Sequence, residues 1–287
     1  MKRTPLLLLA ALLALAPRAA HADGAVDDPL TNDPNGNPCF AVDDVAAQMD
    51  FGEPNSAFAR QPNCPSLCKK AGAVCQRYVK RAASCRTAFA RDAATFKIKK
   101  LCDGLTGADL RTCQAPFQTE RDTAISGAGG IDELESGELS KCGDQVTSCT
   151  AQCGDPNAPA PRGELGTAFS GLPCADPNDA AQTFDFSGTL IGVTNCTHLC
   201  VQAFNVCRRS ALDAASCQLS LVNDWIGFDS QVDCAGLKGS ELSDCRNGWS
   251  QDERSWRQAI INERAGVLGS GGACASTAQK CLNCSGQ

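Results

Sequence analysis

Apolar residues along the chain recur with the period of an α-helix. In the segment 64–102, Leu67, Ala71 and Val74 stand at the i, i+4 and i+7 positions that share one helix face. Proline and glycine are absent from the later part of this segment, where alanine, arginine and lysine abound. The pattern therefore predicts one long helix, or two helices with a bend near Ser84.

Further helical segments follow in the same half of the chain. A second helix is predicted over about 109–125, a glycine-rich break covers 127–130, and a last helix carries Cys142 and Cys153. Because the second half repeats this plan, the predicted fold class is all-α.

The cysteines fall into two sets of ten with matching spacing. The middle eight of the first set recur at a constant offset of 132 residues, so that Cys196 corresponds to Cys64. Only the outermost two depart from this offset, by +3 at Cys174 and by −1 at Cys284. We call two residues related by this offset equivalent. A match of this kind indicates two tandem units with ten cysteines each. The first set is Cys39, Cys64, Cys68, Cys75, Cys85, Cys102, Cys113, Cys142, Cys149 and Cys153.

The N-terminus has the order of regions found in secretory signal peptides. Lys2 and Arg3 precede an apolar run from Leu6 to Ala16, and small residues end at Ala22. We predict an exported protein of the periplasm, cell surface or extracellular medium, with no transmembrane segment. The predicted parts are a signal peptide at 1–22, a flexible polar lead at 23–38, cysteine-rich helical unit 1 at 39–153, a Pro/Gly-rich linker at 154–173 and cysteine-rich helical unit 2 at 174–287.

Export changes how charge and cysteine content are interpreted. Loss of Lys2, Arg3 and Arg18 with the signal takes the formal net charge from −6 to −9, which disfavours nonspecific nucleic-acid binding. An oxidising compartment favours disulfides over free thiols. Aromatic residues make up only 5% of the chain, so cross-links would support a thin core.

The steps between cysteines predict how six of the first ten are paired. Cysteines step by 4 and 7 at the start of the unit and by 7 and 4 at its end, and both sets lie on single helix faces. If these two helices pack antiparallel, each of the three cysteines on the first helix faces one of the three cysteines on the last helix. The predicted pairs are Cys64 with Cys153, Cys68 with Cys149 and Cys75 with Cys142, and in unit 2 Cys196 with Cys284, Cys200 with Cys281 and Cys207 with Cys274.

The other four cysteines of unit 1 are expected to form two more bridges. Spacing alone does not choose among the possible pairings of Cys39, Cys85, Cys102 and Cys113.

One charged segment distinguishes the two units. Residues 69–100 hold ten lysines and arginines against the single acid Asp92, whereas 201–232 hold two arginines against three aspartates. A basic helix in an acidic protein suggests contact with an anionic polysaccharide or an acidic protein, although a solvated helix face explains the same pattern. The candidate anion-binding residues are Lys69, Lys70, Arg77, Lys80, Arg81, Lys97, Lys99 and Lys100.

Two chemical alternatives are considered for the cysteines and the remaining polar residues. Cysteine stripes on a helix resemble those of exported copper-storage bundles, a resemblance that implies soft-metal handling. An uncharacterised secreted hydrolase is the other alternative, with His198 as the single histidine left after signal removal. No motif indicates a catalytic residue, a metal ligand or a cofactor.

The segment NCPSLCKKAGAVC resembles the helix of Frizzled-type cysteine-rich domains, which are helical modules with ten cysteines that bind lipid-modified signals. The resemblance rests on the C-x3-C-x6-C spacing and covers about a dozen residues per unit. Frizzled domains place most cysteines before this helix, whereas here only Cys39 precedes it, so no residue role is transferred. The sequence therefore predicts an exported, disulfide-stapled binding or structural module of unknown ligand.

Overall fold

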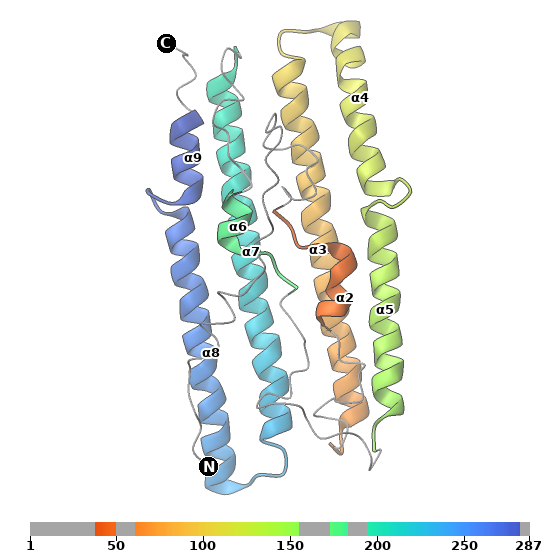
Figure 1. Cartoon of the computed structure of the whole chain (residues 1–287), viewed down its shortest axis with the longest axis vertical. Coiled ribbons are helices and arrows are strands. Elements are labelled where there is room, and N and C mark those ends of the chain that lie inside the picture. Colours follow the sequence, from red (N-terminus) through yellow and green to blue (C-terminus); the bar gives the residue numbers. More distant parts are fainter. Residues whose placement is uncertain (1–37, 50–60, 155–172, 183–193, 282–287) are drawn as a thin grey trace.

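A computed structural model describes residues 38–49, 61–154, 173–182 and 194–281, and every regular element in these ranges is a helix. Four long helical columns lie side by side in one layer (Figure 1). The central columns are α3 (Cys64–Leu101) and α7 (Cys196–Asp233), which run in opposite directions. Each outer column consists of two helices: α4 (Gly107–Ser126) and α5 (Ile131–Ala151) beside α3, and α8 (Gly239–Leu268) and α9 (Ala273–Cys281) beside α7.

The all-α prediction is confirmed, and the segment predicted as helical at 64–102 forms the single helix α3, with no break at Ser84. The predicted signal peptide 1–22 lies outside the described residues, as do all but the ends of the lead 23–38 and the linker 154–173. The division into units therefore remains a prediction.

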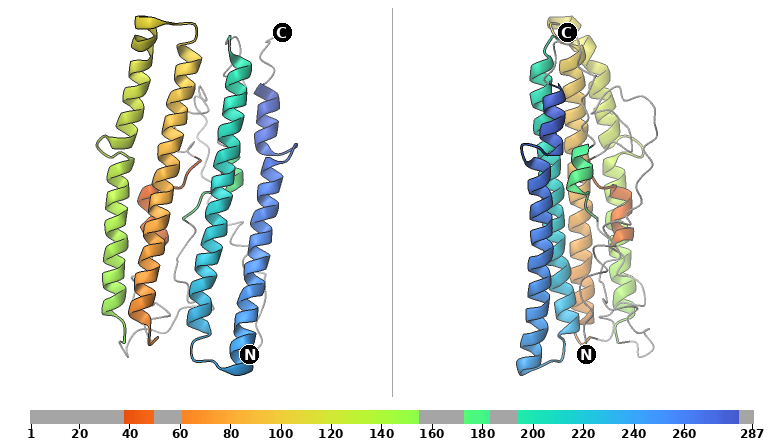
Figure 2. Two further views of the ribbon diagram at one scale, coloured as in Figure 1. Left: turned by 180° about the vertical axis from the view of Figure 1, so that it is seen from behind. Right: turned by 60° about the vertical axis from the view of Figure 1, so that its left-hand side comes forward.

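Short helices cover one face of the layer. They are η1 (Val42–Asp44) and α2 (Val45–Gln48), which pack against α3 and α5, and α6 (Pro177–Gln182), which lies over α7 (Figures 1 and 2). Glu138 of α5, 2% exposed, holds α2 in place by accepting a hydrogen bond from the Ala46 N–H at 2.9 Å. Lys141 neutralises the Glu138 carboxylate.

Each central helix turns back at a glycine. Gly104 and Gly236 follow α3 and α7 with φ of 75° and 80°, a left-handed conformation that side chains with a Cβ rarely adopt. The next helix starts at Gly107 in the first half and at Gly239 in the second.

The expectation that unit 2 repeats the plan of unit 1 is wrong for the later helices. The first half breaks after Ser126, whereas α8 continues to Leu268 before α9 begins. Glycines at 127, 129 and 130 end α4, but the corresponding stretch of α8 contains helix-forming residues, and its glycines come only at 269, 271 and 272. The break therefore moves with the glycines, while the cysteine positions do not.

Disulfides tie each outer column to its central helix. Cys64–Cys153, Cys68–Cys149 and Cys75–Cys142 join α3 to α5 and the residues that follow it, with Cα–Cα distances of 5.6, 5.8 and 5.9 Å. Cys207–Cys274 joins α7 to α9. These four bridges are pairs that the cysteine steps predict.

Other bridges complete the set among the described residues. Cys196 and Cys200 are also disulfide-bonded, but the side chains of their predicted partners Cys284 and Cys281 lie outside the described residues. The pairs that spacing left open are Cys39–Cys85 and Cys102–Cys113 in the first half, and Cys174–Cys217 and Cys234–Cys245 in the second.

The two halves exchange core residues. Phe96 of α3 is fully buried in the apolar cluster that α7 forms with α6 and α9, and Phe228 of α7 is fully buried in the cluster that α3 forms with α2 and α5. Phe96 and Phe228 are equivalent, so the exchange joins the same position of the two halves. Each core is therefore completed by the other half of the chain.

Candidate functional site

Part of the basic side of α3 is directed at α7. Lys70 Nζ lies 4.9 Å from the centre of the Phe228 ring, and Lys99 Nζ lies 3.5 Å from His198 Nε2. Arg77 donates to both carboxylate oxygens of Asp224, at 3.0 and 2.8 Å. Of these three cations, Arg77 thus has an acidic partner within the same chain.

Two ion pairs connect α3 and α7 in a reciprocal way. Arg77 pairs with Asp224, and Arg209 pairs with Asp92. The two arginines are equivalent, and so are the two aspartates, so each helix supplies the same two positions to the other. The hydroxyl of Tyr78, 1% exposed, also donates to Asp224 at 3.0 Å, and burial together with the Asp224 charge raises the pKa of this phenol.

The remaining candidate cations divide into paired and unpaired groups. Lys97 is half-buried and pairs with Glu120 of α4 at 2.8 Å. Within the described ranges, Lys69, Lys80 and Lys100 form no ion pair or hydrogen bond through their side chains. Lys69 and Lys80 are exposed, and Lys100 is half-buried.

A cavity of about 340 Å³ lies between the middle of α3 and the middle of α7. It is open to solvent on one side and is lined by equivalent parts of both halves, including the disulfides Cys39–Cys85 and Cys174–Cys217. Most of the remaining wall is apolar, with the Phe40 ring, two prolines and several alanines. The polar side chains of the lining are Arg81, Ser84, Arg209 and Asp213.

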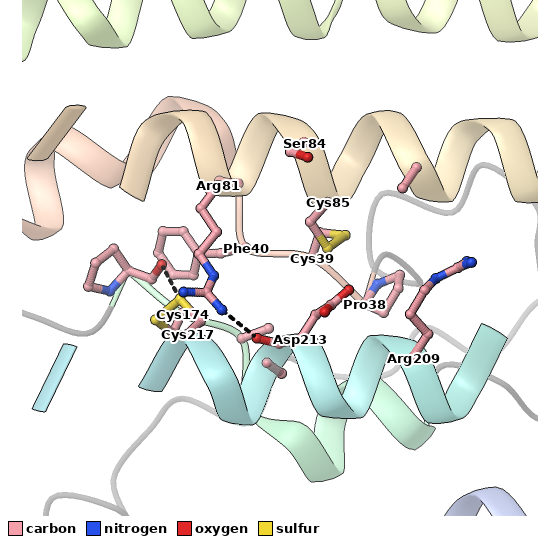
Figure 3. A pocket seen from close by; sticks show the side chains of 15 residues that line it. Pro38, Cys39, Phe40, Arg81, Ser84, Cys85, Cys174, Arg209, Asp213 and Cys217 are labelled. Carbon is pink, nitrogen blue, oxygen red and sulfur yellow. Dashed lines mark hydrogen bonds between the residues drawn. A yellow bond between two sulfur atoms is a disulfide. The ribbon is translucent and has the colours of Figure 1, made fainter. Parts of the chain in front are cut away.

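Arg81 spans this cavity from α3 to α7 (Figure 3). Its guanidinium donates to Ser220 Oγ at 3.2 Å, to Ser216 Oγ at 2.8 Å and to the Asp213 backbone carbonyl at 3.4 Å. All three acceptors are neutral oxygens, so the positive charge of Arg81 has no carboxylate partner among the described residues. The Asp213 side chain points from α7 toward α3 between Arg81 and Arg209, as Figure 3 shows.

The cysteine stripes do not offer thiolates to a metal in this structure. The Sγ atoms of Cys64, Cys68 and Cys153 lie within 4.8 Å of one another, a separation that suits a shared metal ion. All three sulfurs are in disulfides, and a disulfide sulfur lacks the thiolate charge that binds soft metals. This geometry supports a structural role for the stripes.

Two carboxyl groups outside these sites have strongly perturbed titration. Burial raises the pKa of Asp229 to about 8, and the charge of Asp233 raises it further. The nearby Trp225 indole has the opposite, smaller effect on this pKa, and its N–H does not reach hydrogen-bonding geometry with the carboxylate. Burial also raises the pKa of Glu263 to about 7, assisted by the charge and hydrogen bond of Asp176. The charged form of Glu263 is therefore disfavoured where this residue lies beside Asp176, just before α6.

His198, the histidine of the hydrolase alternative, is exposed next to Lys99. A general base needs an orienting acceptor, and a lysine does not provide one. The structure thus assembles no base and nucleophile around this residue within the described ranges.

The sequence alone does not predict the cavity or the reciprocal ion pairs. A signal for the ion pairs is present, because arginine occupies the equivalent positions 77 and 209 and aspartate occupies 92 and 224. The role of Arg81 has no such signal, since its equivalent position holds Asp213.

Comparison with protein-family models, with curated proteins and with solved structures gives no match for this chain. Among the described helices, none combines the length and apolar character that a membrane span requires.

Proposed function

We propose that the chain is an exported, disulfide-stapled binding module that contacts an anionic polysaccharide through the exposed face of α3 that carries Lys69, Lys80 and Arg91. The observation that carries this proposal is a line of cations that the fold leaves unneutralised. Lys69, Lys80 and Arg91 follow one another at steps of 11 residues, close to three helical turns, and all three are exposed. No ion pair engages them within the described residues.

The spacing of this line suits an extended polymer better than a compact ligand. At a rise of about 1.5 Å per residue, successive cations are separated by roughly 16 Å along the helix, and the line extends over roughly 33 Å. The opposite side of α3 carries the cysteines that bond to α5, which keeps the line rigid. Because the helix backbone is already ordered, binding costs only the freedom of the side chains themselves.

Export is part of this proposal and rests on two supports. The N-terminal order of regions is typical of a signal peptide, and the described cysteines are all in disulfides, as expected in an oxidising compartment. Secreted protein used for the binding test is expected to begin at Asp23.

The test is retention on a heparin column under a salt gradient. The variant Lys69→Gln/Lys80→Gln/Arg91→Gln should elute at clearly lower salt than the wild type, because the line of charge is lost. A matched control, Lys238→Gln/Arg246→Gln/Arg254→Gln, removes three exposed positive charges from the second half of the chain. Equal loss of retention in both variants would contradict a specific site on α3. Retention on an immobilised acidic protein but not on heparin would replace the polysaccharide with a protein partner.

A further inference from the structure

The cavity between α3 and α7 combines an apolar lining with an arginine that no carboxylate of the described residues neutralises. We infer that this cavity binds a small amphipathic molecule bearing a carboxylate group. The inference is independent of polysaccharide binding, because Lys69 and Lys80 do not line the cavity.

The size and lining of the cavity suit a small apolar body. Its volume of about 340 Å³ lies at the lower end of the range of roughly 300–1,000 Å³ typical of small-molecule sites. Phe40, Ala82, Ala88 and Ala214 supply apolar wall, and two disulfides add polarizable sulfur. Transfer of a hydrocarbon chain from water to such a wall is favourable.

Arg81 provides the recognition of the carboxylate. A guanidinium has five N–H donors, and three hydrogen bonds to neutral oxygens leave donors for a ligand. These three bonds also hold the side chain in place across the cavity, so little of its freedom remains to be lost on binding. The Nε–H and one Nη1–H remain, and they lie on different edges of the guanidinium. This half-buried, fixed arginine therefore favours a carboxylate that accepts one charge-assisted hydrogen bond.

The other charges of the cavity set the position of the ligand. Arg209 is already paired with Asp92, which reduces its attraction for a second anion. Asp213 repels an anion from the α7 side. The carboxylate of the ligand is therefore placed at Arg81, with its apolar part between Phe40 and the alanines.

Isothermal titration calorimetry of the full chain with sodium octanoate tests the inference. Saturable binding of about one octanoate per chain is expected, and 1-octanol should bind about tenfold more weakly because it lacks the charge. Arg81→Gln should weaken octanoate binding about tenfold or more. Asp213→Asn should strengthen it roughly twofold to fivefold by removing a repulsive charge.

Lys80→Gln is the matched control for Arg81→Gln, since it removes a neighbouring charge that points outside the cavity. Octanoate affinity should be unchanged in this variant. Equal weakening by Lys80→Gln and Arg81→Gln would overturn the assignment, and so would the absence of saturable octanoate binding to the wild type.

A second variant keeps the test decisive if Arg81→Gln does not fold. Ala88→Phe fills the cavity and leaves Arg81 in place, so it should abolish octanoate binding. Heparin retention should stay as in the wild type, which separates failure of this inference from failure of the polysaccharide proposal. Octanoate affinity at the wild-type level in Ala88→Phe would overturn the cavity as the site.

Discussion

Asp229 is a carboxyl group at a position where the other half of the chain has a lysine. The equivalent residue, Lys97, forms an ion pair with Glu120. Asp229 is 2% exposed, and neither of its carboxylate oxygens has a hydrogen-bond partner among the described residues. Its pKa of about 8 follows from burial, because the charged form loses its hydration without gaining a partner.

Stability should therefore fall as the pH rises toward and through 8. Between its ordinary pKa near 4 and about 8, Asp229 is protonated in the folded state and ionised in the unfolded state. The folded state thus binds more protons over this interval, and it carries the full penalty of a buried charge above it. Asp229→Asn should flatten this dependence and raise the free energy of unfolding at pH 9 by on the order of a few kcal/mol.

Guanidinium unfolding at several pH values measures this effect. Asp252→Asn is a suitable control, because Asp252 is exposed. A wild type and an Asp229→Asn variant with parallel pH profiles would show that Asp229 is ionised and partnered in solution.

Residues of this type show the limit of prediction from the sequence. Composition counts Asp229 among the acids that set the charge of the segment 201–232, but it does not predict that this side chain is buried. The same holds for Arg77 and Arg81, whose pattern indicates surface charge although both contact α7. The packing of one long helix against another determines the environments of these residues. The local sequence pattern does not predict that packing.

At the scale of elements, the spacing of cysteines within helices predicts many of the disulfide pairs. Cys64, Cys68 and Cys75 return to one helix face, so the partner helix must present its cysteines in the reverse order. Cys39 and Cys102 lie outside long helices, where no periodicity fixes direction. Their partners, Cys85 and Cys113, are evident only from the path of the chain.

Burial orders the disulfides by their resistance to reduction. Cys75–Cys142 has both residues fully buried, whereas Cys113 of Cys102–Cys113 and Cys85 of Cys39–Cys85 are partly exposed. A thiolate must reach a sulfur along the bond axis, so a buried bridge is attacked only after local opening. Timed reduction, alkylation and peptide mass mapping should find Cys75–Cys142 cleaved last in the first half. Early cleavage of this bridge would contradict the packing of α5 on α3.

At the scale of the molecule, the exchange of Phe96 and Phe228 couples the two halves. Two sets of cysteines suggest two independent units, and each set does form its own bridges among the described residues. The cores nevertheless depend on each other, because each buries a phenylalanine from the opposite helix. Sequence repetition reveals the repeated unit but not the surface by which the copies meet.

Phe96→Ala should destabilise both halves together. Truncating a fully buried phenylalanine costs about 3–5 kcal/mol, and here the cavity opens in the core around α7 although the mutation is in α3. Calorimetry should show one transition for the wild type and a lower Tm for Phe96→Ala. Phe117→Ala provides a comparison at a less buried phenylalanine of α4. Two transitions in the wild type, of which Phe96→Ala shifts only the one assigned to its own half, would contradict this coupling.

The contact between Arg81 and Asp213 has a consequence for ligand orientation. These two positions are equivalent and face each other across the cavity, where the two halves of the layer meet. In an assembly of two identical chains, one amino acid would occupy both sides, and a cation would oppose a cation. A single chain encodes the two sides separately, so its cavity has a cationic wall and an anionic wall within a repeated backbone. Such a cavity distinguishes the head of a bound molecule from its tail.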